Sequence, residues 1–245
     1  MPAGSTYEVV QNADAFGLLD DLAGAGGARF ETAGVLRRGS RVFATMKLPG
    51  TIRIAGDDVH DMYVAVATSH DGSMALTAMV TPVRVVCQNT LSFGIGEAPR
   101  IHRIRHTSSA KARMAEAEAV LDTAEHYAKS FAETANRLVS MRLGRFDADA
   151  MLEKLWPDVG ADCTKARNAE ARAMVLGIYD CSQSTAGYTG TSWGLLQSVS
   201  EYVGHVAKPR GGIAGAQRRA EGMLLGDGTP ARLLAKAGSL LGALV

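Results

Sequence analysis

The stretch AKARMAEAEAVLDTAEHYAKSFAETANRLV (110–139) decides the fold, because it predicts one long uninterrupted helix. It is rich in Ala and Glu and contains neither Gly nor Pro, and Ser108 or Ser109 is a suitable N-cap. Its apolar side chains recur at helical spacing: Met114, Val120, Leu121, Ala124, Tyr127, Ala128, Phe131, Ala135 and Leu138. One face of this helix must therefore pack on a sheet or on a neighbouring subunit.

Before the long helix, alternating and β-branched residues predict an antiparallel β-meander. In its clearest hairpin, MYVAVATS (62–69) and SMALTAMV (73–80) flank HDG (70–72), and Asp-Gly is typical of tight hairpin turns. A second turn candidate is RRG (37–39). The predicted strands are 6–10, 29–36, 41–48, 51–54, 62–69, 73–80 and 101–106.

The rest of the chain is predicted to be helical. A short helix is expected at 13–23, and 83–95 fits another, although its β-branched residues also permit a strand. The helices predicted after the long one are 148–156, 164–179, 192–206, 214–224 and 230–241, with glycine-rich loops at 186–190 and 211–215. We therefore expect an α+β protein, in which an N-terminal antiparallel β-meander packs on a long helix (1–140) and a helical C-terminal half follows (141–245).

Composition is that of an ordinary globular protein, with 47% hydrophobic and 21% charged residues in a chain of 245. The net charge of +1 creates no global attraction to nucleic acid or membranes, so any electrostatic argument depends on local clusters. Neither a signal peptide nor a run of about 18 apolar residues is present, which predicts a cytoplasmic protein without a membrane partner. Cys87, Cys163 and Cys181 lack CxxC spacing and predict reduced, mostly buried thiols.

Two catalytic hypotheses are weaker than their structural alternatives. Cys87 could act as a nucleophile with a histidine base, His70, His102 or His106, but free cysteine is among the most buried residue types. A metal site would combine His60, His70, Asp57, Asp58, Asp61 and Asp71. Their spacing matches no known ligand template, and aspartate is common beside turn glycines for backbone reasons alone.

Motifs for nucleotides and for hydrolytic catalysis are missing from the sequence. GxxxxGK[ST], GxSxG and HExxH do not occur, and the GIG at 94–96 lacks the third glycine of the dinucleotide pattern. We therefore expect no cofactor, no metal and no enzymatic activity.

One segment, APRIHRIRHTSSAKARM (98–114), is strongly basic and carries no acid. If 101–106 is a strand, Arg103 and Arg105 point to one face, and the start of the long helix adds N–H groups and a positive dipole end. This pattern suits a nucleic-acid backbone, with solvated surface as the alternative. Solvated surface is favoured for two smaller groups: Arg37, Arg38, Arg41 and Lys47 on the first hairpin, and Lys208, Arg210, Arg218 and Arg219 near the C-terminus.

Several motifs occur in a recognisable order: YEVVQN (7–12), SHDG (69–72), TPVRVVCQNTL (81–91), RHT (105–107) and GTSWGLLQSVSEY (190–202) with His205. With these motifs the chain resembles the phage/plasmid-like protein family, a domain of unknown function common in actinobacteria and their phages. Typical members carry a further N-terminal Trp-His-Gly motif, which is missing here, and differ at Gln197, Ser198, Ser200 and Gly204. The resemblance directs attention to Arg84, Asn89, Arg105, His106, Trp193, Glu201 and Tyr202.

The predicted order of a short helix, a β-meander and one long helix is similar to the core of the Rad-fifty-two and RecT class of single-strand annealing proteins. This likeness implies a homo-oligomeric ring or filament that binds single-stranded DNA by its sugar-phosphate backbone. The expected nucleic-acid-binding residues are Arg84, Arg100, Arg103, Arg105, His106, Lys111, Arg113, Arg37, Arg38, Arg41 and Lys47. Because aromatic residues make up only 6%, backbone charge would have to dominate the binding. The alternatives are a non-catalytic interaction or regulatory scaffold of a mobile element and, third, a metal- or cysteine-dependent enzyme.

The motif around Trp193 is interpreted as core. In SWGLLQSVSEYV (192–203), Trp193, Leu196 and Val199 keep helical spacing, which favours packing over a stacking platform for bases. Glu201 and His205 lie four residues apart, so a side-chain pair is geometrically allowed on a helix.

Overall fold

The computed structural model describes residues 17, 19–24, 27–36, 39–56, 58–70, 76–82, 101–103, 110–208, 211–212, 214–216, 218–219 and 228–243. They form two compact units. The sheet unit holds the described residues up to Ser130 except 54–56, and the helical unit holds 54–56 and the described residues from Phe131 onward. The predicted strand 6–10 and the ambiguous segment 83–95 lie outside the described residues.

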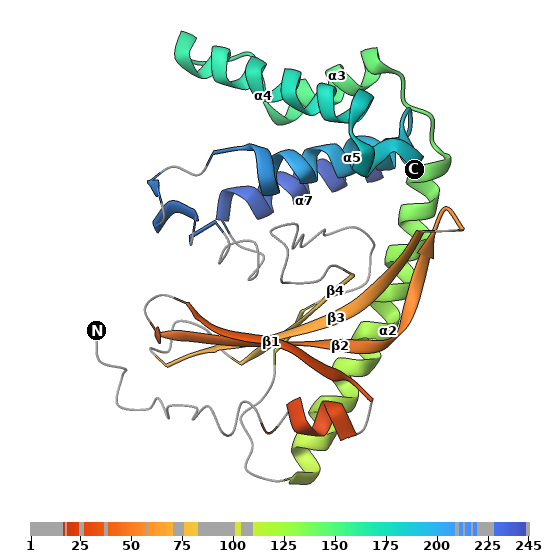
Figure 1. The fold of residues 1–245 in the computed structure, drawn as a ribbon, viewed down its shortest axis with the longest axis vertical. Coiled ribbons are helices and arrows are strands. Elements are labelled where there is room, and N and C mark those ends of the chain that lie inside the picture. The colour runs from red at the N-terminus through yellow and green to blue at the C-terminus, as the bar shows by residue number, and fades with distance from the viewer. Residues whose placement is uncertain are drawn as a thin grey trace. The chain divides into compact units, whose positions relative to one another are not determined.

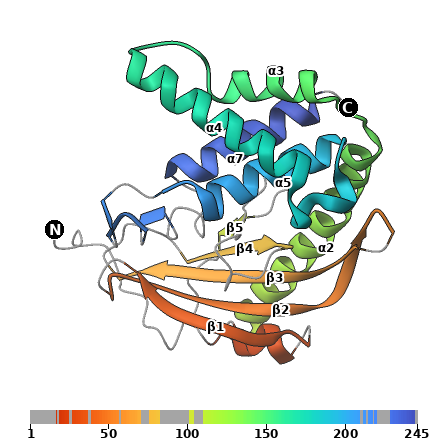
Figure 2. The same cartoon turned by 45° about the horizontal axis from the view of Figure 1, so that its top comes forward.

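The sheet unit contains a five-stranded antiparallel sheet in the order β1-β2-β3-β4-β5, which confirms the predicted meander (Figure 2). Its strands are β1 (Arg29–Leu36), β2 (Arg41–Ile54), β3 (Asp58–Ser69), β4 (Thr77–Thr81) and β5 (Ile101–Arg103). The two segments predicted at 41–48 and 51–54 form one continuous strand, in which Gly50 adopts a positive φ of 90° that glycine tolerates. The outer strands of the sheet are thus β1 and β5.

The long helix α2 (Ala110–Ser140) packs against this sheet, as the sequence predicts (Figure 1). Its buried side chains are Ala117, Val120, Ala124, Tyr127, Phe131, Ala135 and Leu138, which recur at helical spacing. In β2 burial is continuous from Ala44 to Met46 and alternates only at the end of the strand, where Ile52 and Ile54 are buried and Arg53 is exposed. The 3.6-residue period thus determines which side chains of α2 enter the core, whereas β3 and β4 contribute consecutive buried residues.

The edge strand β1 keeps an exposed apolar surface. Phe30 and Val35 are 54% and 68% exposed, and the β1–β2 register shifts between Phe30 and Thr32. Gly34 pairs with Phe43, whose ring would lie 2.8 Å from a Cβ at that glycine. The ring therefore covers the glycine, and a side chain at residue 34 would displace it.

The helical unit consists of helices that pack on one another in pairs. They are α3 (Arg145–Leu155), α4 (Asp162–Cys181), the 3-10 helix η2 (Gln183–Tyr188), α5 (Ser192–Glu201), the π-helical turn η3 (Tyr202–Val206) and α7 (Gly228–Gly242). Together with the sheet unit, this arrangement confirms the predicted α+β class. Two details differ from the prediction. The segment 186–190 was expected to be a loop but begins within a 3-10 helix. The helix expected at 192–206 is α-helical only to Glu201 and ends in a π-helical turn.

The start of α5 is a compact hydrogen-bonded corner. The Thr191 hydroxyl donates to the Tyr188 carbonyl at 2.6 Å and accepts from the Gly194 amide at 3.1 Å, so it caps the helix. Trp193 is 1% exposed and lies edge-on to Phe131 and Tyr188, with ring centroids 5.9 and 6.4 Å away. The interpretation of Trp193 as a core residue is confirmed.

Tyr179 gives the helical unit a pH-dependent contact. It is 2% exposed, and its hydroxyl donates to the Leu143 carbonyl at 2.6 Å. Burial raises the pKa of Tyr179, so the folded protein resists ionisation of a phenol that ionises near pH 10 when unfolded. This contribution to stability is present below about pH 10 and is lost as pH rises through the folded-state pKa.

We therefore expect the free energy of unfolding to decline above about pH 10, and to decline less in Tyr179→Phe. At neutral pH that variant should lose about 1–3 kcal/mol, because the Leu143 carbonyl is left without its donor. Urea unfolding of both proteins between pH 7 and pH 11 measures both effects. Parallel pH curves would show that Tyr179 does not carry the dependence.

Candidate nucleic-acid interface

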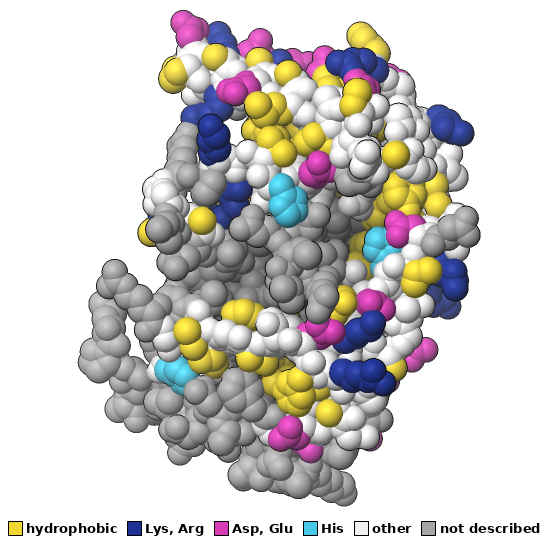
Figure 3. All heavy atoms as spheres, viewed as in Figure 1, with side chains coloured by type: hydrophobic (Ala, Val, Ile, Leu, Met, Phe, Trp, Pro, Cys, Tyr) yellow, Lys and Arg dark blue, Asp and Glu magenta, His cyan; other side chains and the backbone are white. Residues whose placement is uncertain are grey.

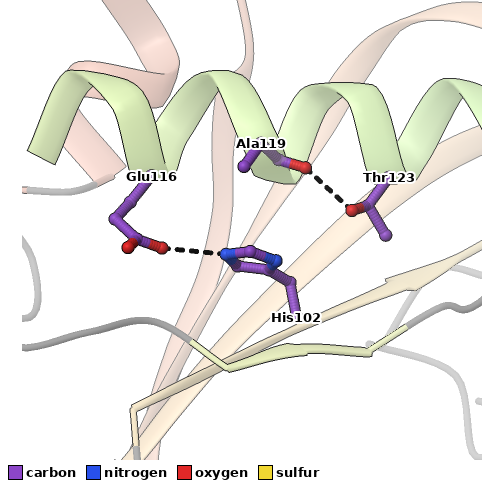
Figure 4. Close-up of polar contacts among 4 residues, drawn as sticks. All are labelled: His102, Glu116, Ala119 and Thr123. Atoms are coloured by element: carbon purple, nitrogen blue, oxygen red, sulfur yellow. Dashed lines mark hydrogen bonds and ion pairs between the residues drawn. The ribbon is translucent and has the colours of Figure 1, made fainter.

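A hydrogen bond between side chains joins β5 to α2, the two elements that contain most of the basic segment. His102 Nε2 lies 2.8 Å from Glu116 Oε2, and both side chains are largely buried (Figure 4). Farther along the same helix, Thr123 donates to the Ala119 carbonyl at 2.8 Å. The contact holds the last described residues of the sheet beside the second turn of α2.

Arg103 is the exposed cation at this position. It ends β5 opposite Thr77 of β4, and strand alternation directs its side chain away from the sheet face on which His102 meets α2. Glu116 is the first acid after Glu97 in the sequence, and its carboxylate is engaged by His102. The side chain of Arg103 is thus directed away from the His102–Glu116 contact.

Most of the other predicted contact residues are not described individually. Lys111 and Arg113 belong to the first turn of α2, with no description of their side chains. The predicted residues outside the described chain are Arg37, Arg38, Arg84, Arg100, Arg105 and His106. Their participation stays a prediction.

Arg41 and Lys47, the two members of the first-hairpin group that the structure describes, are poor candidates for a phosphate contact. Lys47 Nζ lies 2.8 Å from Asp61 Oδ2, and this hydrogen bond raises the pKa of Lys47. Arg41 is only 6% exposed. A phosphate would have to compete with Asp61 for Lys47 and would reach little of Arg41, so we leave both out of the interface proposed below.

Described Lys and Arg side chains on the face shown in Figure 3 lie in small groups, several of them beside acidic side chains. A continuous basic surface of the described residues is not visible on that face. On this face, a nucleic-acid contact made by the described residues would depend on a few local sites.

The structure brings together one cluster in the helical unit that the sequence did not reveal. Trp156, just after α3, meets Tyr202 edge-on with ring centroids 5.6 Å apart. Burial, then Glu170, raises the pKa of Tyr202, and nearby Arg219 lowers it. Burial also lowers the pKa of Arg219, which marks a partly desolvated guanidinium. Arg219, for which solvated surface was the favoured interpretation, is partly exposed and partly buried.

The π-helical turn changes the expected partner of Glu201. The Ala207 amide donates to the Tyr202 carbonyl at 2.8 Å, an i→i+5 bond that widens the turn. The Glu201 carboxylate accepts from the Ser182 hydroxyl at 3.3 and 3.2 Å, while His205 is exposed. The side-chain pair of Glu201 with His205 that helical spacing allowed is replaced by a contact to α4.

The cysteine and metal hypotheses gain no support from the described residues. Cys163 and Cys181 are exposed, so the prediction of buried thiols is wrong for these two, which stand near the ends of α4. Cys87 lies outside the described residues. Among the residues that the structure describes, no three His, Cys, Asp or Glu side chains are grouped to share a metal ion. None of the described helices is long and apolar enough to cross a membrane.

The fold defines an α+β protein with a meander sheet, a long helix that belongs to both units, and a helical C-terminal half. A family model described as Domain of unknown function (DUF932) matches residues 3–229. The match spans nearly the whole chain, so the chain belongs to this family. Neither a curated protein nor a solved structure matches it.

Proposed function

We propose that this chain binds single-stranded DNA by its sugar-phosphate backbone and anneals it as a homo-oligomer of the phage recombination type. The observation that carries the proposal is the placement of Arg103. It is exposed at the end of β5, which the His102–Glu116 hydrogen bond holds beside the start of α2. A guanidinium binds phosphate well, because it keeps its charge and offers several N–H donors.

The resemblance to the phage/plasmid-like family and the order of meander and long helix support this choice. The family label supplies no activity, and only the order of meander and long helix is shared with the annealing class. Likeness of fold alone argues function weakly. The proposal requires no catalytic step and no cofactor, and it assigns the protein to the cytoplasm. The proposal also includes assembly of several copies of the chain, which would align many weak phosphate contacts along one DNA strand.

Arg103→Ala combined with Arg105→Ala is expected to weaken binding of a single strand and to flatten its salt dependence. Two lost phosphate contacts should lower the slope of log affinity against log salt by about 1.4, or about 0.7 for each contact. Fluorescence anisotropy of a labelled strand of ~40 nucleotides, titrated at several salt concentrations, measures this slope. The fold should remain intact, because Arg103 is exposed.

A matched control is Lys129→Ala with Arg232→Ala, which also removes two exposed cations, from α2 and α7. Its salt slope should equal that of the parent protein. Equal slopes for all three proteins would remove the β5–α2 segment from the interface. Failure of the parent protein to bind a single strand at low salt would exclude the function itself.

The second candidate is an interaction scaffold, and the exposed edge of β1 favours it. Phe30 and Val35 are more than half exposed there, and a shallow pocket is lined by Phe30, Glu31, Thr32, Ala33 and Ala44. Exposed apolar edges are typical places for another chain to bind. A stable protein complex that forms equally with and without DNA would favour this function over annealing.

A further inference from the structure

The outer edge of β1 is only weakly protected against pairing with another strand. Among the described strands, β1 pairs with β2 alone, so its other side forms an outer edge of the sheet (Figure 2). Proteins usually protect such edges by short strands, by proline or lysine, or by a bulge. The opposite outer strand, β5, has only three residues, whereas β1 has eight and contains neither Pro nor Lys. Of these devices, β1 has the bulge alone.

The bulge in β1 places three apolar side chains on one face of the sheet. They lie opposite alternate residues of β2: Phe30, Ala33 and Val35 pair with Met46, Ala44 and Val42. Directly opposite residues share a face, and alternate residues of a strand point the same way. Without the register shift between Phe30 and Thr32, Phe30 would point to the other face from Ala33 and Val35. The bulge therefore builds a continuous apolar row along the edge.

This row extends a buried part of the sheet out to solvent. Its three partners on β2 are at most 6% exposed, whereas Phe30 and Val35 are 54% and 68% exposed and Ala33 is exposed as well. The shallow pocket at this edge has a volume of about 400 Å³ and is lined by Phe30, Glu31, Thr32, Ala33 and Ala44. A strand added to β1 would bury the row and could place a side chain in the pocket.

The apolar row is symmetric about Ala33. Phe30 and Val35 lie two positions on either side of it when counted along β2, because the three partners on β2 are each two residues apart. A two-fold axis through Ala33, perpendicular to the sheet, would bring Phe30 of each copy opposite Val35 of the other. Aromatic and β-branched side chains form stabilising cross-strand pairs. Glu31 would fall opposite Gly34 of the second copy, so like charges would not face one another.

We propose that this edge binds a second copy of the chain, and that the two β1 strands pair antiparallel about a two-fold axis at Ala33. A contact of this kind uses the same surface on both copies, makes every interaction twice and closes at a dimer. A strand of an unrelated protein could pair with the same backbone, but the symmetric spacing about Ala33 would have no role in that complex. The dimer goes beyond the proposed function, because it forms without DNA, and it would supply one contact of the proposed homo-oligomer.

Val35→Lys should weaken dimerisation about 100-fold, because two valine side chains lose their buried contacts and each contributes about tenfold. Val35 is exposed in the single chain, so the fold should be retained. Sedimentation velocity over a series of protein concentrations measures the dissociation constant, with the dimer at twice the chain mass of 25.8 kDa. The matched control is Val59→Lys. Val59 is 47% exposed near the start of β3, away from the edge, so this variant should dimerise like the parent protein.

Ala33→Cys tests the register in a chain whose native cysteines, Cys87, Cys163 and Cys181, are replaced by Ser. Cα atoms directly opposite in an antiparallel pair are about 4.5–5.5 Å apart, which a disulfide can span, so mild oxidation should link the two copies. Val35→Cys in the same background should not be linked. The two Val35 residues would lie four positions apart along the strands, or about 13 Å.

Two results would overturn the inference. A parent protein that stays monomeric at its highest soluble concentration would leave the edge to a different protein. A dimer that persists in Val35→Lys, with equal linking of Ala33→Cys and Val35→Cys, would show that the copies meet at another surface. Anisotropy of a labelled single strand on the same samples tests the proposed function separately. A dimer linked at Ala33 that binds no strand at low salt would exclude the proposed function and leave this inference standing.

Discussion

Gly194→Ala is expected to destabilise the protein by about 3–5 kcal/mol, above the roughly 1–3 kcal/mol of ordinary overpacking. A Cβ at residue 194 would lie 2.2 Å from the Tyr188 carbonyl oxygen and 3.0 Å from its carbon. These are backbone atoms, so no rotation of a side chain relieves the clash. The same Tyr188 carbonyl accepts the Thr191 hydroxyl that caps α5, so a shift of the backbone also weakens the cap.

The matched control for this substitution is Gly177→Ala. Both glycines lie within helices, but no neighbouring atom is within 4 Å of the Cβ position at residue 177. This variant should be as stable as the parent protein or more stable by up to about 1 kcal/mol, because alanine is the better helix former. Urea unfolding of the three proteins measures the difference. Similar stabilities for the two variants would show that the corner at Tyr188 yields easily.

Trp193→Ala should cost about 3–5 kcal/mol, the range for removing a large aromatic side chain from a core. Trp193 is among the largest fully buried side chains, and it packs edge-on against Phe131 of α2 and Tyr188 of η2. Its loss would leave a cavity between elements that are distant in sequence. The unfolding free energy and the melting temperature both report the effect.

Phe146→Ala provides the comparison for a large aromatic residue that makes no such contacts. Phe146 is 87% exposed near the start of α3, so its removal should change stability by less than about 0.5 kcal/mol. A loss in Trp193→Ala no larger than that in Phe146→Ala would contradict the core assignment. Comparing the stability losses of the two variants therefore tests the packing of α5 directly.

The elements of this fold could be predicted from sequence because their patterns are local. The helix 110–139 has an unbroken run of helix formers, and 62–69 has a run of β-branched and small residues that fits a buried strand. Both correspond to observed elements, α2 and β3. The end of α5 could not be predicted, since nothing in the sequence of 192–206 distinguishes an i→i+4 from an i→i+5 bond.

The candidate sites could be predicted only in part, because they depend on which side chains meet in space. Charge counting in the sequence made both Lys47 and Arg103 contact candidates, with solvated surface favoured for the Lys47 group. It could not show that Lys47 has an aspartate within hydrogen-bond distance in a neighbouring strand. Trp156 and Tyr202 stand on segments separated by all of α4. These two side chains meet only because the helices pack together, so no local sequence motif predicts their contact.

The continuity of α2 has a consequence for how this protein can be divided. The boundary between the two units falls at Ser130 and Phe131, inside one helix of 31 residues and not in a loop. A protease therefore finds no flexible connection at that point, and a cut there would leave each fragment with a frayed helix end. For the same reason, a gene rearrangement that duplicated or exchanged one unit would have to include part of this shared helix.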